Sequence, residues 1–156
     1  MHENALLSMK YHRLHHLFFL CISKKMGNPF VHPGQGALLG CLLDNGSMSQ
    51  GELCRKLQVS AAAVAVSLRR LEQQGMILRL KNPSDLRGKL LSLTPLGTET
   101  AREMRCAVNT VQSLAIAGFT EEELEFLTGY LSRIINNLST YLDSDRTENN
   151  PYSQGE

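Results

Sequence analysis

The chain has 156 residues, of which 42% are hydrophobic and 20% charged, and its formal net charge at pH 7 is +1. This length favours one compact domain, or one small domain with a helical extension, and the ordinary hydrophobic fraction argues against a disordered protein. No run of about 18 apolar residues occurs, so we expect no membrane span. The N-terminal apolar run is too short for a signal peptide, which predicts a cytoplasmic protein.

The small net charge hides an uneven distribution. Residues 1–43 carry a net charge of +3, residues 44–93 carry +4, and residues 94–156 carry −6. A basic middle segment beside an acidic C-terminal segment predicts that the middle segment contacts a polyanion.

The first predicted element is a helix over residues 5–26, where apolar residues recur at helical spacings. Residues 27–30 (GNPF) end it, because Pro29 disfavours helical geometry in the residue before it. A second helix is predicted over residues 34–43 and should stop near Asn45 and Gly46.

Two short helices follow in close succession. Ser49 and Glu52 match the Ser-x-x-Glu capping box, which predicts a helix that starts there and runs to Leu57. Ser60 is the predicted N-cap of the next helix, which ends at Gly75. Two short helices separated by about three residues have the spacing of a helix-turn-helix.

A β-hairpin is predicted directly after these helices. Residues 76–81 (MILRLK) and 89–93 (KLLSL) read as short strands, and residues 82–88 (NPSDLRG) as a turn-rich connection between them. A hairpin that follows a helix-turn-helix makes a winged helix.

The C-terminal third is predicted to be helical. Thr94 and Pro95 are the expected N-cap and first residue of a helix to about residue 117. Thr120 and Glu123 form a second capping box, which precedes an apolar stripe over five turns. From Asp143 onward the chain is polar and is expected to fray.

The predicted fold class is therefore mainly α with a small β-wing (α+β). The predicted divisions are an N-terminal helix (1–33), a winged helix-turn-helix (34–93, with the helix-turn-helix at about 49–74 and the wing at 76–93), C-terminal helices (94–142) and a flexible tail (143–156).

The helix that starts with SAAAVAVSLRR raises a question, because it has apolar residues on two faces. Val64, Leu68 and Leu71 share one face, and Ala62 and Val66 begin the opposite one. Either the helix is buried on both sides, or its outer face meets something other than water.

Three segments together resemble the MarR family of bacterial transcription regulators over about residues 35–140: SQGELCRKLQVSAAAVAVSLRRLEQQGMILR, NPSDLRGKLLSLTPLG and FTEEELEFL. The Asp-x-Arg pair followed by Leu-Thr-Pro-x-Gly is the most specific part. The first helix fits in length and character but has no distinctive motif. The resemblance implies a homodimer, held by N- and C-terminal dimerisation helices, that binds a pseudo-palindromic, A·T-rich double-stranded DNA operator.

In such a protein the second helix of the helix-turn-helix lies in the major groove. The alanine methyl groups at its start can pack against thymine methyl groups, but they cannot donate hydrogen bonds. Most relatives carry several polar residues there, so this chain should make few hydrogen bonds to base edges. Later residues of the helix are expected at phosphates, with Arg69 also able to reach guanine.

The wing supplies the remaining contacts. Arg87 resembles the family's wing-tip arginine, which enters a narrow A·T-rich minor groove, and Asp85 is expected to support the wing, or to be a plain turn residue. Arg79, Lys81 and Lys89 are expected at phosphates, or alternatively on a solvated strand face. The expected DNA-binding residues are Ser49, Gln50, Ser60, Ala61, Ala62, Ala63, Ala65, Val66, Ser67, Arg69, Arg70, Gln73, Arg79, Lys81, Arg87 and Lys89.

Members of the family often bind a small aromatic or lipophilic effector and then release DNA, and others sense peroxide or zinc. Cys21 lies where a peroxide-sensing thiol could be, but its neighbours are apolar, and a buried thiol is the simpler interpretation. The same holds for the other cysteines, Cys41, Cys54 and Cys106, none of which is in CxxC spacing.

A metal-sensing role has a similar candidate in the first helix. His12, His15 and His16 lie near one helix face, where two imidazoles could share a metal ion, or could simply form a polar face. No metal site or cofactor is predicted from this spacing alone.

The interpretation favoured by the sequence is a homodimeric, sequence-specific DNA-binding transcription regulator that acts as a repressor and is released by a small effector. The alternatives are a winged-helix protein-interaction module, and a redox- or metal-sensing regulator that uses Cys21 or the pair His12 and His16. An enzyme is not supported, because no catalytic grouping is recognisable.

Overall fold

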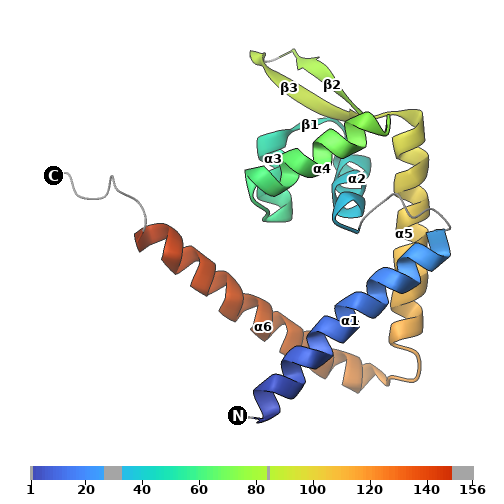
Figure 1. The fold of residues 1–156 in the computed structure, drawn as a ribbon, viewed down its shortest axis with the longest axis vertical. Helices are drawn as coiled ribbons and strands as arrows, with labels where there is room; N and C mark the ends of the chain where they lie inside the picture. The colour runs from blue at the N-terminus through green and yellow to red at the C-terminus, as the bar shows by residue number, and fades with distance from the viewer. Residues whose placement is uncertain (1, 27–32, 84, 149–156) are drawn as a thin grey trace. The chain divides into compact units, whose positions relative to one another are not determined.

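The computed structural model describes residues 2–26, 33–83 and 85–148, and two units make up the chain, Met1–Leu114 and Ala115–Glu156. The elements, in chain order, are α1 (His2–Met26), α2 (Pro33–Asn45), β1 (Met48–Ser49), α3 (Gln50–Leu57), α4 (Ala61–Gln73), β2 (Ile77–Asn82), β3 (Asp85–Leu93), α5 (Pro95–Ala115) and α6 (Glu121–Glu148) (Figure 1). The predicted class, mainly α with a small β-sheet, is confirmed. None of the described helices is both long enough and apolar enough to cross a membrane.

The core of the first unit holds α2, α3, α4 and the central strand together. Its largest fully buried side chains are Leu39, Leu53, Val64, Leu68, Leu71 and Leu91. Burying a side chain of this size contributes about 1.5–3 kcal/mol relative to leaving it in water. Three of the six come from α4, so this helix is anchored along one face.

The strands form an antiparallel sheet in the order β1-β3-β2. β1 pairs Met48 with Leu91, and β2 pairs with β3 in regular register as far as Lys81. An irregularity follows between Lys81 and Asn82, so that Asn82 lies opposite Asp85. The hairpin of β2 and β3 is the wing.

The strands differ from the prediction in two places. β3 begins at Asp85, so most of the segment 82–88, which the sequence predicts as a connection, belongs to the strands β2 and β3. β1 is not predicted at all, because a strand of two residues has no periodicity and forms only through its pairing with β3. The helix α6 also continues to Glu148, past residue 143 where the polar tail is predicted to begin. The predicted break at residues 27–30 lies outside the described residues.

The helix starts predicted from capping residues are confirmed. The Ser49 hydroxyl oxygen accepts the Glu52 N–H at 3.3 Å, and the Glu52 carboxylate accepts the Ser49 N–H at 2.7 Å. Thr120 and Glu123 repeat this reciprocal arrangement at the start of α6. Ser60 caps α4 with a side-chain oxygen alone.

The wing joins α5 through Thr94. Its hydroxyl donates to the Gly75 carbonyl at 2.7 Å and accepts the Gly97 N–H at 3.0 Å, while its own N–H donates to the Met76 carbonyl at 3.0 Å. A Cβ atom on Gly97 would lie 1.9 Å from the Met76 carbonyl oxygen, so only glycine fits. The hydrogen bonds of Thr94 and this close approach account for the threonine and the glycine of the Leu-Thr-Pro-x-Gly pattern.

Candidate nucleic-acid interface

A tight turn fixes the start of α4 relative to α3. Gln58 adopts a left-handed backbone conformation with φ of 52°, which is uncommon outside glycine, and its N–H donates to the Cys54 carbonyl. The Val59 N–H donates to the same carbonyl at 3.2 Å. Across the turn, the Gln50 side-chain amide donates to the Ala61 carbonyl at 3.4 Å. Gln50 therefore helps to position the first residue of α4.

The opposite faces of α4 have different environments. Val64, Leu68 and Leu71 are at most 2% exposed, whereas Val66, on the opposite face, is 56% exposed. Other exposed residues of the helix are Ala61, Ala62, Ala63, Arg69, Arg70 and Gln73, and Ala65 and Ser67 are half-buried. Within the unit, the helix is thus buried on one side only, and small apolar side chains followed by cations form its open face.

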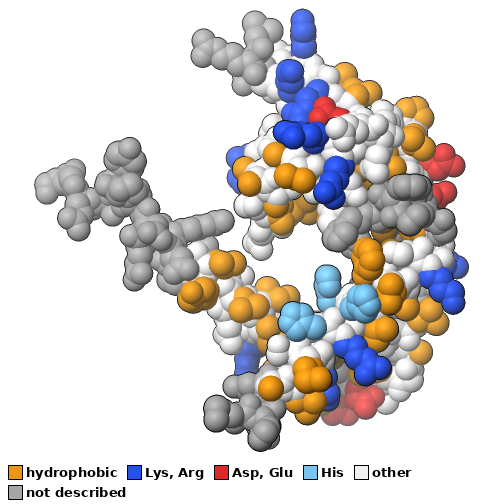
Figure 2. All heavy atoms as spheres, viewed as in Figure 1, with side chains coloured by type: hydrophobic (Ala, Val, Ile, Leu, Met, Phe, Trp, Pro, Cys, Tyr) orange, Lys and Arg blue, Asp and Glu red, His pale blue; other side chains and the backbone are white. Residues whose placement is uncertain are grey.

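The wing carries an unfavourable charge pair. Lys81 and Lys89 occupy directly opposed positions on β2 and β3, and both are exposed. Like charges at opposed positions destabilise an antiparallel pair. Figure 2 shows Lys and Arg side chains gathered over the wing. A polyanion at this surface would relieve the repulsion.

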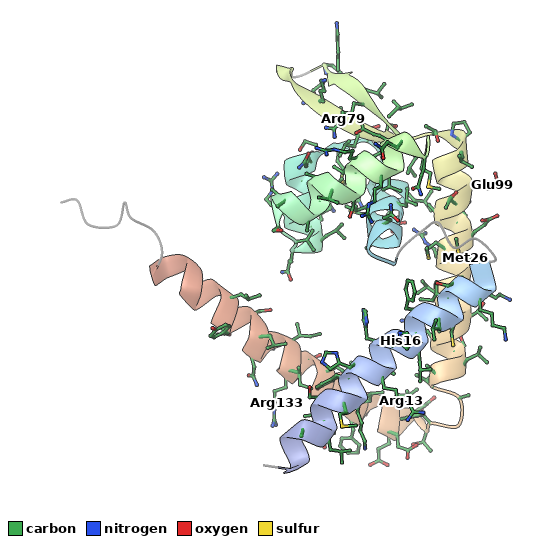
Figure 3. All side chains as sticks on the ribbon, viewed as in Figure 1. Arg13, His16, Met26, Arg79, Glu99 and Arg133 are labelled. Atoms are coloured by element: carbon green, nitrogen blue, oxygen red, sulfur yellow. The ribbon has the colours of Figure 1, made fainter. Side chains whose placement is uncertain are left out.

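Arg79, two residues before Lys81, is already paired. Its Nε lies 2.7 Å from Glu72 Oε1 and its Nη2 lies 3.2 Å from Glu72 Oε2, and each side chain is about one-third exposed (33% and 32%). Figure 3 labels Arg79 at the foot of the wing, where β2 leaves α4. The arginine that the sequence predicts as a phosphate contact is engaged by a carboxylate of α4. Glu72 was not among the predicted site residues, because nothing in its spacing from Arg79 marks a pair.

Ser49, another predicted phosphate contact, is also engaged. Its hydroxyl donates to Glu52 Oε2 at 2.7 Å, while its oxygen accepts the Glu52 N–H. These hydrogen bonds, first from the Ser49 backbone and then from its side chain, hold the pKa of the Glu52 carboxyl below its ordinary value. The ionised carboxylate beside Ser49 disfavours a phosphate at the hydroxyl, although the backbone N–H groups at the start of α3 could still reach one.

The wing-tip residues are described only in part. The backbone of β3 passes through Asp85 and Arg87, but their side chains lie outside the described residues. Their predicted roles, wing support and minor-groove contact, stay predictions.

The expectation that the cysteines are mostly buried is wrong. Cys21 and Cys106 are exposed, and Cys41 and Cys54 are half-buried. The local reason is that α1 buries Ile22 in the core while the adjacent position turns away from it, and Cys106 likewise lies on the outer face of α5. Exposure alone does not make Cys21 a sensor, because a reactive thiol also needs neighbouring groups that stabilise the thiolate.

The histidines of α1 are exposed. His12, His15 and His16 all lie on the surface, and Figure 2 shows histidine side chains together on the visible face of the helix. In the described part of the chain, no three His, Cys, Asp or Glu side chains gather so that they could hold a metal ion.

An open cavity of about 470 Å³ lies between α2, α3 and α5. Gly36, Gly40 and Met104 are among its apolar lining residues. Two cations also line it. Lys56 donates to Asn45 Oδ1 at 2.7 Å, and Arg105 pairs with Asp44 at 2.6 Å.

Comparisons with known proteins give a consistent picture. Residues 31–89 match the family model described as the MarR family. The chain is 31% identical over 102 residues to the uncharacterized HTH-type transcriptional regulator YdgJ of Bacillus subtilis, covering 65% of this chain and 62% of the relative. It is 32% identical over 94 residues to the HTH-type transcriptional repressor MdtR of the same organism, covering 60% of this chain and 61% of the relative.

The chain thus spans about three-fifths of the length of these curated relatives. Among solved structures, the S. aureus MepR-DNA complex has a TM-score of 0.75 at 22% identity, with 83% of this chain and 96% of that chain covered. At this identity the likeness concerns the fold. Residues 31–89 thus resemble the MarR family, and the chain has the winged helix-turn-helix fold.

Proposed function

We propose that the protein is a homodimeric, sequence-specific regulator that binds double-stranded DNA and represses transcription. The observation that carries the proposal is the open face of α4, small and apolar at its start and cationic farther along, next to a wing with an unfavourable lysine pair. Support comes from MdtR, which is named as a repressor, and from MepR, which is named in complex with DNA.

In this proposal α4 lies in the major groove. The methyl groups of Ala61, Ala62 and Val66 pack against thymine methyl groups, and their small size lets the helix backbone approach the groove closely. Ala63, Ala65 and Ser67 lie at the margin of this contact, and Ser60 holds the start of the helix as its cap. Arg69, Arg70 and Gln73 then reach phosphates.

The wing completes the interface. Lys81 and Lys89 contact phosphates, which relieves their mutual repulsion. Arg87 enters an A·T-rich minor groove, with Asp85 holding the tip of the wing. Arg79, Ser49 and Gln50 bond to other groups of the protein, and they position the wing, α3 and the start of α4 without contacting DNA.

Fluorescence anisotropy tests this function. The purified protein is titrated at several salt concentrations against duplex DNA from upstream of its own gene, with a scrambled duplex of equal length as control. We expect the operator to be preferred by about a thousandfold, with log K falling against log salt by about 0.9 for each phosphate contacted. Equal affinity for both duplexes at every salt concentration would contradict sequence-specific recognition of the upstream DNA.

A different result would favour the alternative. If neither duplex binds at low salt, the open apolar face of α4 serves a protein partner instead of DNA. An Arg87→Ala variant adds a second check, because it should bind more weakly and discriminate less between A·T-rich and mixed flanks.

The cavity between α2, α3 and α5 favours a second element of function, release of DNA by a small aromatic effector. A Cβ atom on Gly40 would meet nothing within 4 Å, so Gly40→Leu can extend into open space at the cavity that Gly40 lines. We expect benzoate or 1-naphthoate to weaken operator binding by the wild type and to have less effect on the Gly40→Leu variant. Equal responses of the two proteins would place the effector elsewhere.

A further inference from the structure

We propose that Glu72 and Arg79 form a strut that fixes the wing at its working angle to the recognition helix, and that Arg79 is a positioning residue and makes no phosphate contact. The inference rests on the proposed DNA-binding function and adds to it a residue, Glu72, that sequence patterns did not indicate. It also removes one cation from the expected set of phosphate contacts.

A short connection joins α4 to β2. Only residues 74–76 separate the helix from the strand, and Gly75 takes a positive φ of 69° within them. The Gly75 and Met76 N–H groups donate back to the Glu72 and Leu71 carbonyls, both at 2.9 Å. The backbone therefore fixes where β2 starts, the buried Ile77 and Leu91 anchor the foot of the hairpin, and a side-chain pair beyond the turn adds a restraint on its direction.

The ion pair supplies this restraint. Glu72 lies in the last turns of α4, and Arg79 is the third residue of β2, so the pair bridges the two elements beyond the turn. Two nitrogens of one guanidinium contact two oxygens of one carboxylate, which fixes direction as well as distance. Because each side chain is about two-thirds covered, the pair is screened less by salt than a fully exposed pair would be.

The register of the wing explains why Arg79 and not its neighbours takes this part. Arg79 lies opposite the fully buried Leu91, at the foot of the sheet, whereas Lys81 lies opposite Lys89 nearer the tip. The carboxylate of Glu72 thus neutralises the cation closest to the core and leaves the two outer lysines to a polyanion. The cation at the foot of the wing, Arg79, thus has a structural role, and the two lysines nearer the tip have a binding role.

Charge-conserving variants separate a strut from a phosphate contact. Arg79→Lys keeps a positive charge that could still bind phosphate, but it loses the planar fork that matches a carboxylate. The DNA probe is a duplex selected from a random-sequence pool. We expect Arg79→Lys and Glu72→Gln each to weaken its binding by on the order of tenfold, and because the two residues form one network their effects should not add. The double variant should cost no more than the larger single one. Arg102→Lys and Glu103→Gln, on exposed positions of α5, are the matched controls.

The salt dependence gives the decisive reading. For both strut variants we expect the slope of log K against log salt to stay as in the wild type, and the preference for A·T-rich flanks to fall. If instead Arg79→Lys binds like the wild type while Arg79→Met lowers the slope by about 0.9, Arg79 contacts a phosphate and the inference is wrong. Stronger binding by Glu72→Gln would overturn it equally.

Hydrogen exchange on the free protein keeps this test separate from the proposed function. Amides of residues 77–93 should exchange faster in Glu72→Gln than in the wild type, while those of residues 61–73 stay unchanged. Unchanged exchange in the wing would overturn the strut whatever the DNA results are. A wild type that prefers no selected duplex, but whose wing loosens in Glu72→Gln, would contradict the DNA-binding function and leave the strut supported.

Discussion

At the scale of single residues, Lys81 and Lys89 show how a side-chain pair can oppose folding and still be useful. The two ammonium groups stand on opposed strand positions at an exposed surface. A sheet selected for stability alone would place opposite charges or β-branched residues there. The pair therefore favours a role in binding over a role in folding.

This conflict makes a prediction in which stability and affinity change in opposite directions. Lys89→Met should raise the free energy of unfolding by about 0.2–1 kcal/mol, because it removes a repulsion, and should reduce the salt slope of DNA binding by about 0.9. Urea denaturation and anisotropy titration measure the two effects. Lys24→Met, on the exposed surface of α1, is the control. A variant that is less stable and keeps the full salt slope would show that Lys89 has a structural role.

Gly97 gives a residue-scale prediction about the joint between the wing and α5. An added Cβ atom would lie 1.9 Å from the Met76 carbonyl oxygen, so Gly97→Ala must push the helix away from the foot of the wing. We expect a loss of about 2 kcal/mol or more in the free energy of unfolding. At Gly40, where a Cβ atom meets nothing within 4 Å, the same substitution should stabilise by about 0.5–1 kcal/mol. Equal effects at the two glycines in urea denaturation would contradict the close packing.

At the scale of elements, the helices could be predicted from the sequence far better than the sheet. The helix starts at Ser49, Ser60, Thr94 and Thr120 follow from side chains that accept the backbone N–H three residues on, so the signal is local. The two-residue strand β1 exists only because β3 passes beside it, and no local pattern carries that information.

Some features of the candidate site can likewise be predicted from the sequence, and others cannot. The open face of α4 is visible in the sequence as a second apolar stripe at helical spacing, which is a local property of one element. The pairing of Glu72 with Arg79 depends on how a strand leaves a helix through a turn with a positive φ, so it becomes visible only in three dimensions. The same holds for Ser49. Its capping role can be predicted from the sequence, but the hydrogen bond that its hydroxyl donates to Glu52 is visible only in the structure.

The capping box of α3 predicts how stability depends on pH. The pKa of Glu52 is held below its ordinary value of 4.5 by hydrogen bonds from Ser49, so the stabilisation is fully present above pH 4.5 and is lost as pH falls through the lowered pKa. The difference in unfolding free energy between the wild type and Glu52→Gln should therefore be largest near pH 7 and shrink in acid. Urea denaturation across this pH range measures it.

Two further variants complete this experiment. Ser49→Ala should cost about 0.5–2 kcal/mol at pH 7, as the loss of an N-cap usually does. Glu103→Gln, which removes the same charge from the exposed face of α5, is the charge-matched control. A Glu52→Gln difference that is constant with pH would mean that the carboxylate charge does not contribute through the cap.

At the scale of the whole molecule, each of the two terminal helices exposes large apolar side chains. Along α6, Leu131 is 42% exposed, Ile135 59%, Leu138 61% and Leu142 60%, and these residues share one face at helical spacing. The helix α1 likewise exposes Leu6, Leu7 and other large side chains. A continuous apolar face of this kind is typical of a protein–protein contact.

A second copy of the chain is the partner that fits the proposed function, since two half-sites one helical turn apart need two winged helices held by one dimer. Ile135→Glu should therefore raise the dimer dissociation constant by about a hundredfold or more, because a carboxylate would be buried without a partner. Thr140→Glu places the same charge on the opposite, exposed side of α6 and should leave the dimer intact. Sedimentation velocity distinguishes the two variants, and the Ile135→Glu protein should also lose its preference for a two-half-site duplex over a single half-site. If both variants sediment like the wild type, the apolar face of α6 is covered by something other than a second copy.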